Sequence, residues 1–210
     1  MTHSPAEIRQ RIIAERRELS AESARELSDR INGRLCAWAE VLPESPRVAM
    51  FRCQKGEVIL DGFDRRLREM GAQIYYPVVD PRIFGMKMFP APSWDAPEFP
   101  GSGDGPGCRG WKQGAFGILE PECAGLEPVE PASLDLILVP SVAIGSLGER
   151  IGMGSGYYDR YLPQAVSAVR VAPIFEFQYF EDGLPECAWD QRVHWAFTEK
   201  RELRLERFKS

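Results

Sequence analysis

Residues 134–162 read LDLILVPSVAIGSLGERIGMGSGYYDRYL, and this stretch decides the fold. Its first segment, Leu134–Val139, is continuously apolar, which is typical of a parallel strand that is covered on both faces. A glycine-rich turn follows, with Gly148, Gly152, Gly154 and Gly156. A short helix is predicted over residues 157–166, so the stretch predicts a strand, a turn and a helix of an α/β protein.

The alternation of strand and helix continues on both sides of this stretch. Apolar spacing predicts two helices before Pro43, the second with Ser20 as its N-cap, and another helix over residues 57–70. Further strands are predicted over residues 47–52, 73–79, 167–175 and 195–198. The pattern predicts a single α/β domain over residues 1–210, with a mostly parallel sheet and helices on both faces.

Three features interrupt the regular pattern. Pro77 suggests that the pairing of the 73–79 strand ends early. The charged residues 200–208 suggest a short helix or a tail. Proline and glycine are concentrated in residues 90–110, and such a long irregular segment is typical of a functional lid or a mobile insertion.

Composition excludes several classes of function. The formal net charge of −5 gives no electrostatic footprint for nucleic acid, and no apolar run approaches the roughly 20 residues of a membrane span. The N-terminus lacks the layout of a signal peptide, and the five cysteines include no C-x-x-C pair. The chain has only two histidines, His3 and His194, so a histidine metal site or a Ser-His-Asp triad is not expected. We therefore expect a cytoplasmic protein with no nucleic-acid or membrane partner. A monomer that acts on small molecules is a separate expectation.

The glycine-rich turn is the best candidate for a binding site. A turn without side chains lets backbone N–H groups approach an anion, and Arg150 adds a cation for phosphate oxygens. Asp159 is an oxygen ligand suited to Mg²⁺, which prefers one or two carboxylates together with substrate phosphates. The spacing matches neither a Walker A loop nor a dinucleotide fingerprint. From spacing alone, an anion site and tight strand–helix packing both remain open.

The residue types in this stretch are more informative than the spacing of its glycines. GERIGMGSGYYDRYL, behind LDLILVPSVAI, resembles the signature of the 5-formyltetrahydrofolate cyclo-ligase (methenyltetrahydrofolate synthetase) family. Other segments resemble that family in the same order along the chain: the basic helix 8–17 with 19–22, then 54–58, 116–121, Asp190 and 198–199. The resemblance therefore extends from about residue 8 to residue 199.

This resemblance implies both an activity and a fold. The family closes the ring of 5-formyltetrahydrofolate to 5,10-methenyltetrahydrofolate and converts ATP to ADP and phosphate. Its three-layer fold is similar to that of sugar-phosphate isomerases and CoA-transferases. The implied chemistry is phosphorylation of the formyl oxygen followed by attack of N10, so catalysis depends on alignment and charge neutralisation. ATP and Mg²⁺ are the implied cofactors.

The resemblance also implies roles for individual residues. The expected nucleotide-binding residues are Arg9, Arg150, Ile151, Gly152, Met153, Gly154, Ser155, Gly156 and Tyr157. Asp159 and Asp190 would bind Mg²⁺, and the expected catalytic residues are Arg150, Tyr158 and Asp159. Glu57 would bind the pterin, while Phe116 and Tyr158 would offer flat surfaces to a ring. Simpler interpretations are core packing for the two aromatic residues, a helix N-terminal carboxylate for Glu57 and a turn aspartate for Asp190.

The sequence departs from the family pattern at several positions. Pro5 stands where the family usually has a phosphate-binding lysine, and Ile59 and Leu60 replace an acidic residue and a threonine. His194 replaces a second aspartate, and the 81–114 region is longer than usual by about a dozen residues. These departures keep two alternatives open: a catalytically weak folate- or nucleotide-binding homologue, and a sugar-phosphate enzyme of the same fold that needs no metal pair.

Overall fold

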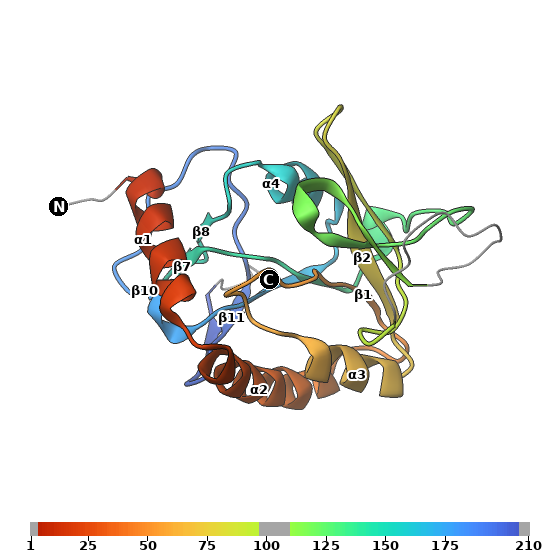
Figure 1. Ribbon diagram of the computed structural model, residues 1–210, viewed down its shortest axis with the longest axis horizontal. Helices are drawn as coiled ribbons and strands as arrows, with labels where there is room; N and C mark the ends of the chain where they lie inside the picture. Colours follow the sequence, from red (N-terminus) through yellow and green to blue (C-terminus); the bar gives the residue numbers. More distant parts are fainter. Residues whose placement is uncertain (1–3, 97–109, 206–210) are drawn as a thin grey trace.

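A seven-stranded sheet forms the centre of the computed structural model, which describes residues 4–96 and 110–205 (Figure 1). The strand order is β12-β11-β9-β6-β1-β2-β3, and all pairings among the five inner strands are parallel. The edge strand β3 pairs antiparallel with β2, and the edge strand β12 pairs antiparallel with β11. In chain order the strands are β1 Arg47–Ala49, β2 Gln73–Asp80, β3 Gly85–Pro90, β6 Leu136–Leu138, β9 Val169–Pro173, β11 Trp195–Phe197 and β12 Glu202–Arg204. The predicted α/β fold with a mostly parallel sheet is confirmed.

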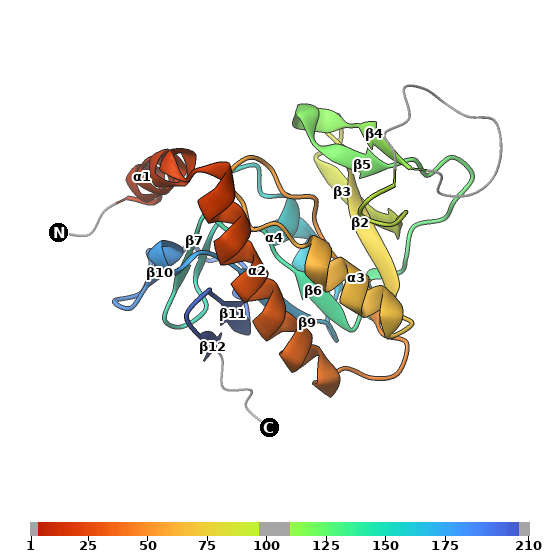
Figure 2. The same ribbon diagram turned by 60° about the horizontal axis from the view of Figure 1, so that its bottom comes forward.

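Helices cover both faces of this sheet. The helices α2 (Ala21–Trp38) and α3 (Asp61–Glu69) lie on one face, as Figure 2 shows, and pack on Val48 and Leu136. The short helix α4 (Tyr157–Tyr161) and the 3₁₀ turn η4 (Leu162–Gln164) pack on the opposite face, against Ala49 and Ile137. Neighbouring residues of one strand point to opposite faces, so each strand contributes to both cores.

Smaller elements complete the fold around the sheet. The strands β7 (Ala143–Gly145), β8 (Arg150–Ile151) and β10 (Tyr179–Phe180) form a second sheet that contacts α1 (Pro5–Glu18). Helix α1 begins with a capping box between Ser4 and Glu7. A hairpin pairs β4 (Trp111–Gln113) with β5 (Leu119–Pro121). The remaining 3₁₀ turns are η1 Ala39–Val41, η2 Ala115–Gly117, η3 Pro131–Ser133 and η5 Glu176–Gln178.

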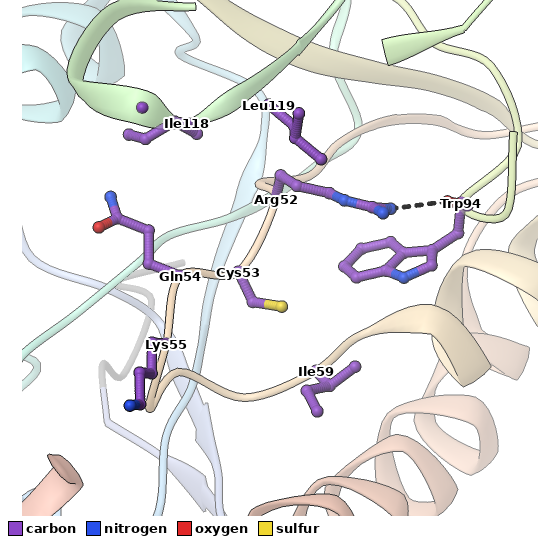
Figure 3. A pocket seen from close by; sticks show the side chains of 9 residues that line it. Arg52, Cys53, Gln54, Lys55, Ile59, Trp94, Ile118 and Leu119 are labelled. Carbon is purple, nitrogen blue, oxygen red and sulfur yellow. Dashed lines mark hydrogen bonds between the residues drawn. The ribbon is translucent and has the colours of Figure 1, made fainter. Parts of the chain in front are cut away.

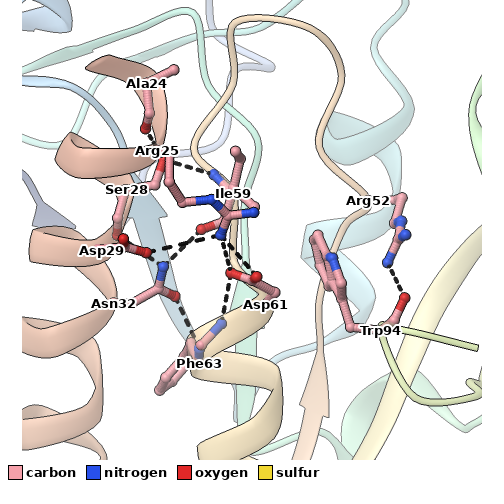
Figure 4. Close-up of polar contacts among 11 residues, drawn as sticks. Ala24, Arg25, Ser28, Asp29, Asn32, Arg52, Ile59, Asp61, Phe63 and Trp94 are labelled. Carbon is pink, nitrogen blue, oxygen red and sulfur yellow. Dashed lines mark hydrogen bonds and ion pairs between the residues drawn. The ribbon is translucent and has the colours of Figure 1, made fainter. Parts of the chain in front are cut away.

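The helix predicted over residues 57–70 begins four residues later, at Asp61. The N-cap residue of α3, Leu60, has no side chain that can cap the helix, so the cap comes from α2. Asn32 accepts a hydrogen bond from the N–H of Phe63 (2.9 Å) and donates one to the carbonyl of Ile59 (2.7 Å), as Figure 4 shows. Ser28 accepts a further bond from the N–H of Ile59 (3.0 Å). Residues 54–57 remain free to form a turn.

Two other predicted helices are also wrong in part. The helix predicted over residues 157–166 ends at Tyr161, because Pro163 lacks an N–H group and the chain continues as the 3₁₀ turn η4. The 200–208 segment forms strand β12, which pairs with β11, where a helix or tail was expected; residues 206–208 lie outside the described part.

The pairing of β2 with β1 does end at Tyr75, before Pro77, but β2 continues to Asp80 along β3.

The predicted irregular segment 90–110 is only partly described. Residue Pro90 ends β3, and Trp94 is buried against Tyr76. Residues 97–109 lie outside the described residues, so the expectation of a lid or insertion stays a prediction. Among the helices of the described segments, none is long and apolar enough to cross a membrane.

Candidate active site

A cavity of about 790 Å³ lies at the carboxyl ends of the parallel strands β1 and β6. Phe51 and Arg52 line it just after β1, and Pro140 and Ser141 line it after β6. Open α/β sheets bind ligands at this edge. Every residue predicted for the site lines this one cavity: Arg9, Glu57, Phe116, Asp190 and all of residues 150–159.

The glycine-rich turn between β8 and α4 forms one wall of the cavity. Gly154 and Gly156 have φ angles of +98° and +68°, which side chains other than glycine rarely adopt. A Cβ atom on Gly152 would lie 2.6 Å from Nη1 of Arg150, so a side chain at this position would displace that guanidinium. Arg9 of α1 donates a hydrogen bond from Nε to the carbonyl of Gly152 (2.8 Å). Helix α4 has only five residues, so bare amides and arginines contribute more to anion binding here than a helix dipole.

Arg150 and Asp159 form an ion pair in the wall of the same cavity. Nη2 of Arg150 lies 2.5 Å from Oδ1 of Asp159, and the N–H of Gln191 donates to the same oxygen at 3.3 Å. The Nε atom of Arg150 is buried and has no hydrogen-bond partner among the described residues. A guanidinium with a free donor is suited to an oxyanion.

Asp190 precedes Gln191, the residue whose N–H contacts Asp159. Its Oδ2 accepts a hydrogen bond from the N–H of Cys187 at 2.8 Å, so it closes its own turn, as the simpler interpretation proposed. It also lines the cavity, and its neighbour Gln191 contacts Asp159. The described residues contain no cluster of three metal-ligating side chains. Two carboxylates fit Mg²⁺ when phosphate oxygens supply the remaining ligands.

Glu57 lines the cavity, and the buried Arg16, which is not one of the lining residues, pairs with it. The Glu57 carboxylate is 11% exposed, lies 3.5 Å from Nη1 of Arg16 and accepts a hydrogen bond from the N–H of Gln54 (3.0 Å). Burial raises the pKa of Glu57, and the charge of Arg16 opposes this rise. The position of Glu57 in a turn before α3 contradicts its interpretation as a helix N-terminal carboxylate.

The two predicted aromatic residues differ in their surroundings. Tyr158 packs against the second core, yet its buried hydroxyl has no hydrogen-bond partner among the described residues. Burial, followed by the nearby charge of Glu57, raises the pKa of this hydroxyl well above its usual range, so it stays protonated. Phe116 is 66% exposed, so core packing is the wrong interpretation for this residue. Its ring centroid lies 6.2 Å from that of Tyr157, and both residues line the cavity.

Two residues at the site were not singled out from the sequence: Arg16, which pairs with the cavity residue Glu57, and Glu120. Arg16 is buried and follows Ile8 and Ile12 on the inner face of α1, and this spacing could have identified it. Glu120 lines the cavity and accepts a hydrogen bond from the N–H of Val79 (3.0 Å); burial raises its pKa. Pro5 also lines the cavity, so the departure from the family's lysine falls within the site itself.

The fold and the cavity define an α/β enzyme, and comparison with known proteins places it among ATP-dependent ligases that form carbon–nitrogen bonds. The model of the 5-formyltetrahydrofolate cyclo-ligase family matches residues 1–199, and the chain belongs to this family. The resemblance seen in the sequence is thereby confirmed.

Individual relatives agree with this assignment. The 5-formyltetrahydrofolate cyclo-ligase of Haemophilus influenzae is 28% identical over 149 residues, which cover 70% of this chain and 72% of the relative. That of Escherichia coli K12 is 28% identical over 155 residues, covering 74% and 75%. The family and its relatives indicate 5-formyltetrahydrofolate cyclo-ligase activity on small-molecule substrates.

Two solved structures have the same fold. The 5,10-methenyltetrahydrofolate synthetase of Aquifex aeolicus is 32% identical, has a TM-score of 0.74 and covers 98% of this chain and 95% of its own. That of Mycoplasma pneumoniae has a TM-score of 0.72 and covers 94% and 99%. At 21% identity, the second structure supports the fold alone.

Proposed function

We propose that this chain closes the ring of 5-formyltetrahydrofolate to give 5,10-methenyltetrahydrofolate, with conversion of ATP to ADP and phosphate. One observation carries the proposal: all residues assigned to nucleotide, metal and folate line a single cavity at the carboxyl ends of the parallel strands. A cavity of about 790 Å³ is within the range of ligand sites in proteins.

The chemistry follows from the substrate. A formyl oxygen is a poor leaving group, so the γ-phosphoryl group is transferred to it while its bond to ADP breaks. The lone pair of N10 then attacks the formyl carbon and forms the new carbon–nitrogen bond. Phosphate leaves with the original oxygen, and N10 loses its proton. The protein contributes alignment and charge neutralisation, which are the main demands of phosphoryl transfer.

The nucleotide occupies the wall formed by the glycine-rich turn. The amides of residues 152–156 and the free donor of Arg150 bind phosphate oxygens. Arg9 fixes the turn through the carbonyl of Gly152 and adds positive charge beside it. Asp159 and Asp190 would hold Mg²⁺, which neutralises charge on the β- and γ-phosphate oxygens when bound.

The folate occupies the part of the cavity around Glu57. The carboxylate of Glu57 accepts hydrogen bonds from the amino-pyrimidine edge of the pterin, and the charge of Arg16 favours the ionised form of that carboxylate. The hydroxyl of Tyr158 is a protonated donor that lines the same cavity and has no hydrogen-bond partner within residues 4–96 and 110–205. The exposed ring of Phe116 provides a flat surface against which a ring can stack.

The test is a spectrophotometric cyclisation assay. Purified protein with 5-formyltetrahydrofolate should show the absorbance of the methenyl product only when both ATP and Mg²⁺ are present. Affinity for nucleotide or folate without any product would instead support a catalytically weak homologue. An absence of both binding and turnover would favour a sugar-phosphate enzyme of the same fold.

A further inference from the structure

Arg160 joins the glycine-rich turn to the tip of a neighbouring hairpin. Its Nη2 donates a hydrogen bond to the carbonyl of Ser155 (2.8 Å), and its Nε donates one to the carbonyl of Phe84 (3.1 Å). Ser155 belongs to the turn, whereas Phe84 lies between β2 and β3, and α4 contacts β3. A Cβ atom on Gly156 would lie 2.8 Å from Nη1 of Arg160, so the guanidinium packs directly against the turn.

The ring of Phe84 packs on the same guanidinium. The Cζ atom of Arg160 lies 5.8 Å from the ring centroid of Phe84 and 5.3 Å from that of Tyr157. Phe84 has a φ angle of +47°, which a bulky side chain rarely adopts, although the residue is 64% exposed. Backbone strain of this kind persists where the surroundings impose it, and it is concentrated at ligand clamps. Because the exposed ring gains little from burial, its contact with Arg160 is the interaction that this conformation serves.

The bond to the carbonyl of Ser155 also fixes the direction of an amide. This carbonyl and the N–H of Gly156 belong to one planar trans peptide group, so they point in opposite directions. Arg9 binds the carbonyl of Gly152 in the same way, which fixes the N–H of Met153. In the described part of the chain, neither N–H group has a hydrogen-bond acceptor. Two arginines therefore aim two free amides of the turn.

A second arginine of the cavity is held in a similar way but does not reach the turn. The Cζ atom of Arg52 lies 4.1 Å from the ring centroid of Trp94 and 4.7 Å from that of Trp111. Arg52 also donates to the carbonyl of Trp94 at 2.8 Å, the bond drawn in Figure 3. Among the contacts of the described residues, none joins Arg52 to residues 152–156. Aromatic faces and a carbonyl thus fix a guanidinium twice at this cavity, and the one beside the turn is that of Arg160.

We propose that Arg160 is a positioning residue for the nucleotide. Through the carbonyl of Ser155 it aims the N–H of Gly156 at a phosphate oxygen, and Phe84 at the tip of the β2–β3 hairpin holds its guanidinium in place. This inference rests on the proposed function, because the glycine-rich turn is the part of the cavity assigned to ATP.

Steady-state kinetics of Arg160 variants test this role. The substitution Arg160→Met removes both donors and should raise the KM for ATP about five- to tenfold, the size of a hydrogen bond from a charged group. Both kcat and the KM for the folate at saturating ATP should stay within about twofold, since the lost contact serves nucleotide binding alone. The substitution Arg160→Lys keeps the charge but lacks the planar fork that reaches two carbonyls, so it should restore only part of the affinity.

The hairpin tip has its own variants. The substitution Phe84→Ala should raise the KM for ATP about two- to threefold, the size of an exposed cation–π contact. Added to Arg160→Met it should have no further effect, because Phe84 acts through Arg160. The matched control is Ile83→Ala, since Ile83 is the exposed neighbour at the same tip and lines neither cavity. Arg160 and Phe84 are both exposed, so the variants should fold, and thermal unfolding checks this.

A binding measurement separates this inference from the proposed function. Isothermal titration with ADP and Mg²⁺ should show a dissociation constant that Arg160→Met raises and Ile83→Ala does not. Cyclisation in Arg160→Met with an unchanged KM for ATP, or full recovery in Arg160→Lys, would overturn the positioning role while the proposed function stands. Binding of ADP that depends on Arg160, without any cyclisation by the wild type, would support the positioning role and refute the proposed function.

Discussion

Replacing Arg16 with methionine removes the charge that faces Glu57 and keeps a side chain of similar length. Arg16 is 7% exposed, and its Nη2 also donates to the carbonyl of Ser141. Removing one partner of a buried ion pair costs about 3–5 kcal/mol of the free energy of unfolding. Because the contact between Nη1 and Oε1 of Glu57 is long, at 3.5 Å, we expect a loss near the low end, about 3 kcal/mol at about pH 8.

The sign of the pH dependence follows from the Glu57 carboxyl. Burial already raises its pKa in the folded protein, and Arg16 opposes that rise, so Arg16→Met raises the pKa further. At a pH between the Glu57 pKa of the folded wild type and the higher Glu57 pKa of the folded variant, the variant binds a proton that the wild type does not. The destabilisation therefore grows with pH across this interval, by up to about 1.4 kcal/mol per pH unit, and is smaller at low pH.

Urea unfolding at about pH 5.5 and about pH 8 measures this difference. The rise of kcat/KM for the folate with pH should also move to higher pH in Arg16→Met, and Arg16→Lys should restore it. Arg17→Met is the control, because Arg17 is the exposed neighbour on the same helix. Equal destabilisation at both pH values would refute the reasoning. Additivity within about 0.5 kcal/mol in the double variant with Glu57→Gln would refute it equally.

Three further predictions concern the turn, the carboxylate and the helix cap. Asp159→Ala should lower kcat about 100-fold or more, and preserved ATP-dependent turnover would exclude its role in phosphate chemistry. Gly154→Ala should lose about 1–2 kcal/mol of the free energy of unfolding and raise the KM for ATP. The control is Gly33→Ala in α2, where the space around the glycine is open; it should gain about 0.5–1 kcal/mol in thermal unfolding. Asn32→Ala should lose about 1–3 kcal/mol in urea unfolding, and a loss below about 0.5 kcal/mol would mean that the cap is dispensable.

The parts of the fold that follow local rules could be predicted from the sequence. The continuous apolar run of β6 indicated a covered parallel strand, and the glycines after β8 indicated a bare turn beside a binding site. Both signals lie within a few residues of the structure they describe. The family pattern then supplied the distant residues, such as Arg9 and Asp190, which line the same cavity.

The parts that failed depend on partners far away in the sequence. Helix α3 starts where Asn32 caps it, 31 residues before Phe63, so its own sequence could not fix the boundary. Strand β12 exists because it pairs with β11, and its charged residues alone suggested a helix or a tail. Arg16 is buried because Glu57 and Ser141 compensate it, and neither partner is local.

The loop that carries Glu57 is attached to α2 through its peptide groups. Ser28 and Asn32 bind the N–H and carbonyl of Ile59 and the N–H of Phe63. Such bonds do not depend on which side chains the loop carries. Evolution or a protein engineer can therefore exchange exposed residues of this loop, such as Lys55, and alter ligand preference while the backbone keeps its place. Ser28 and Asn32 themselves lack this freedom.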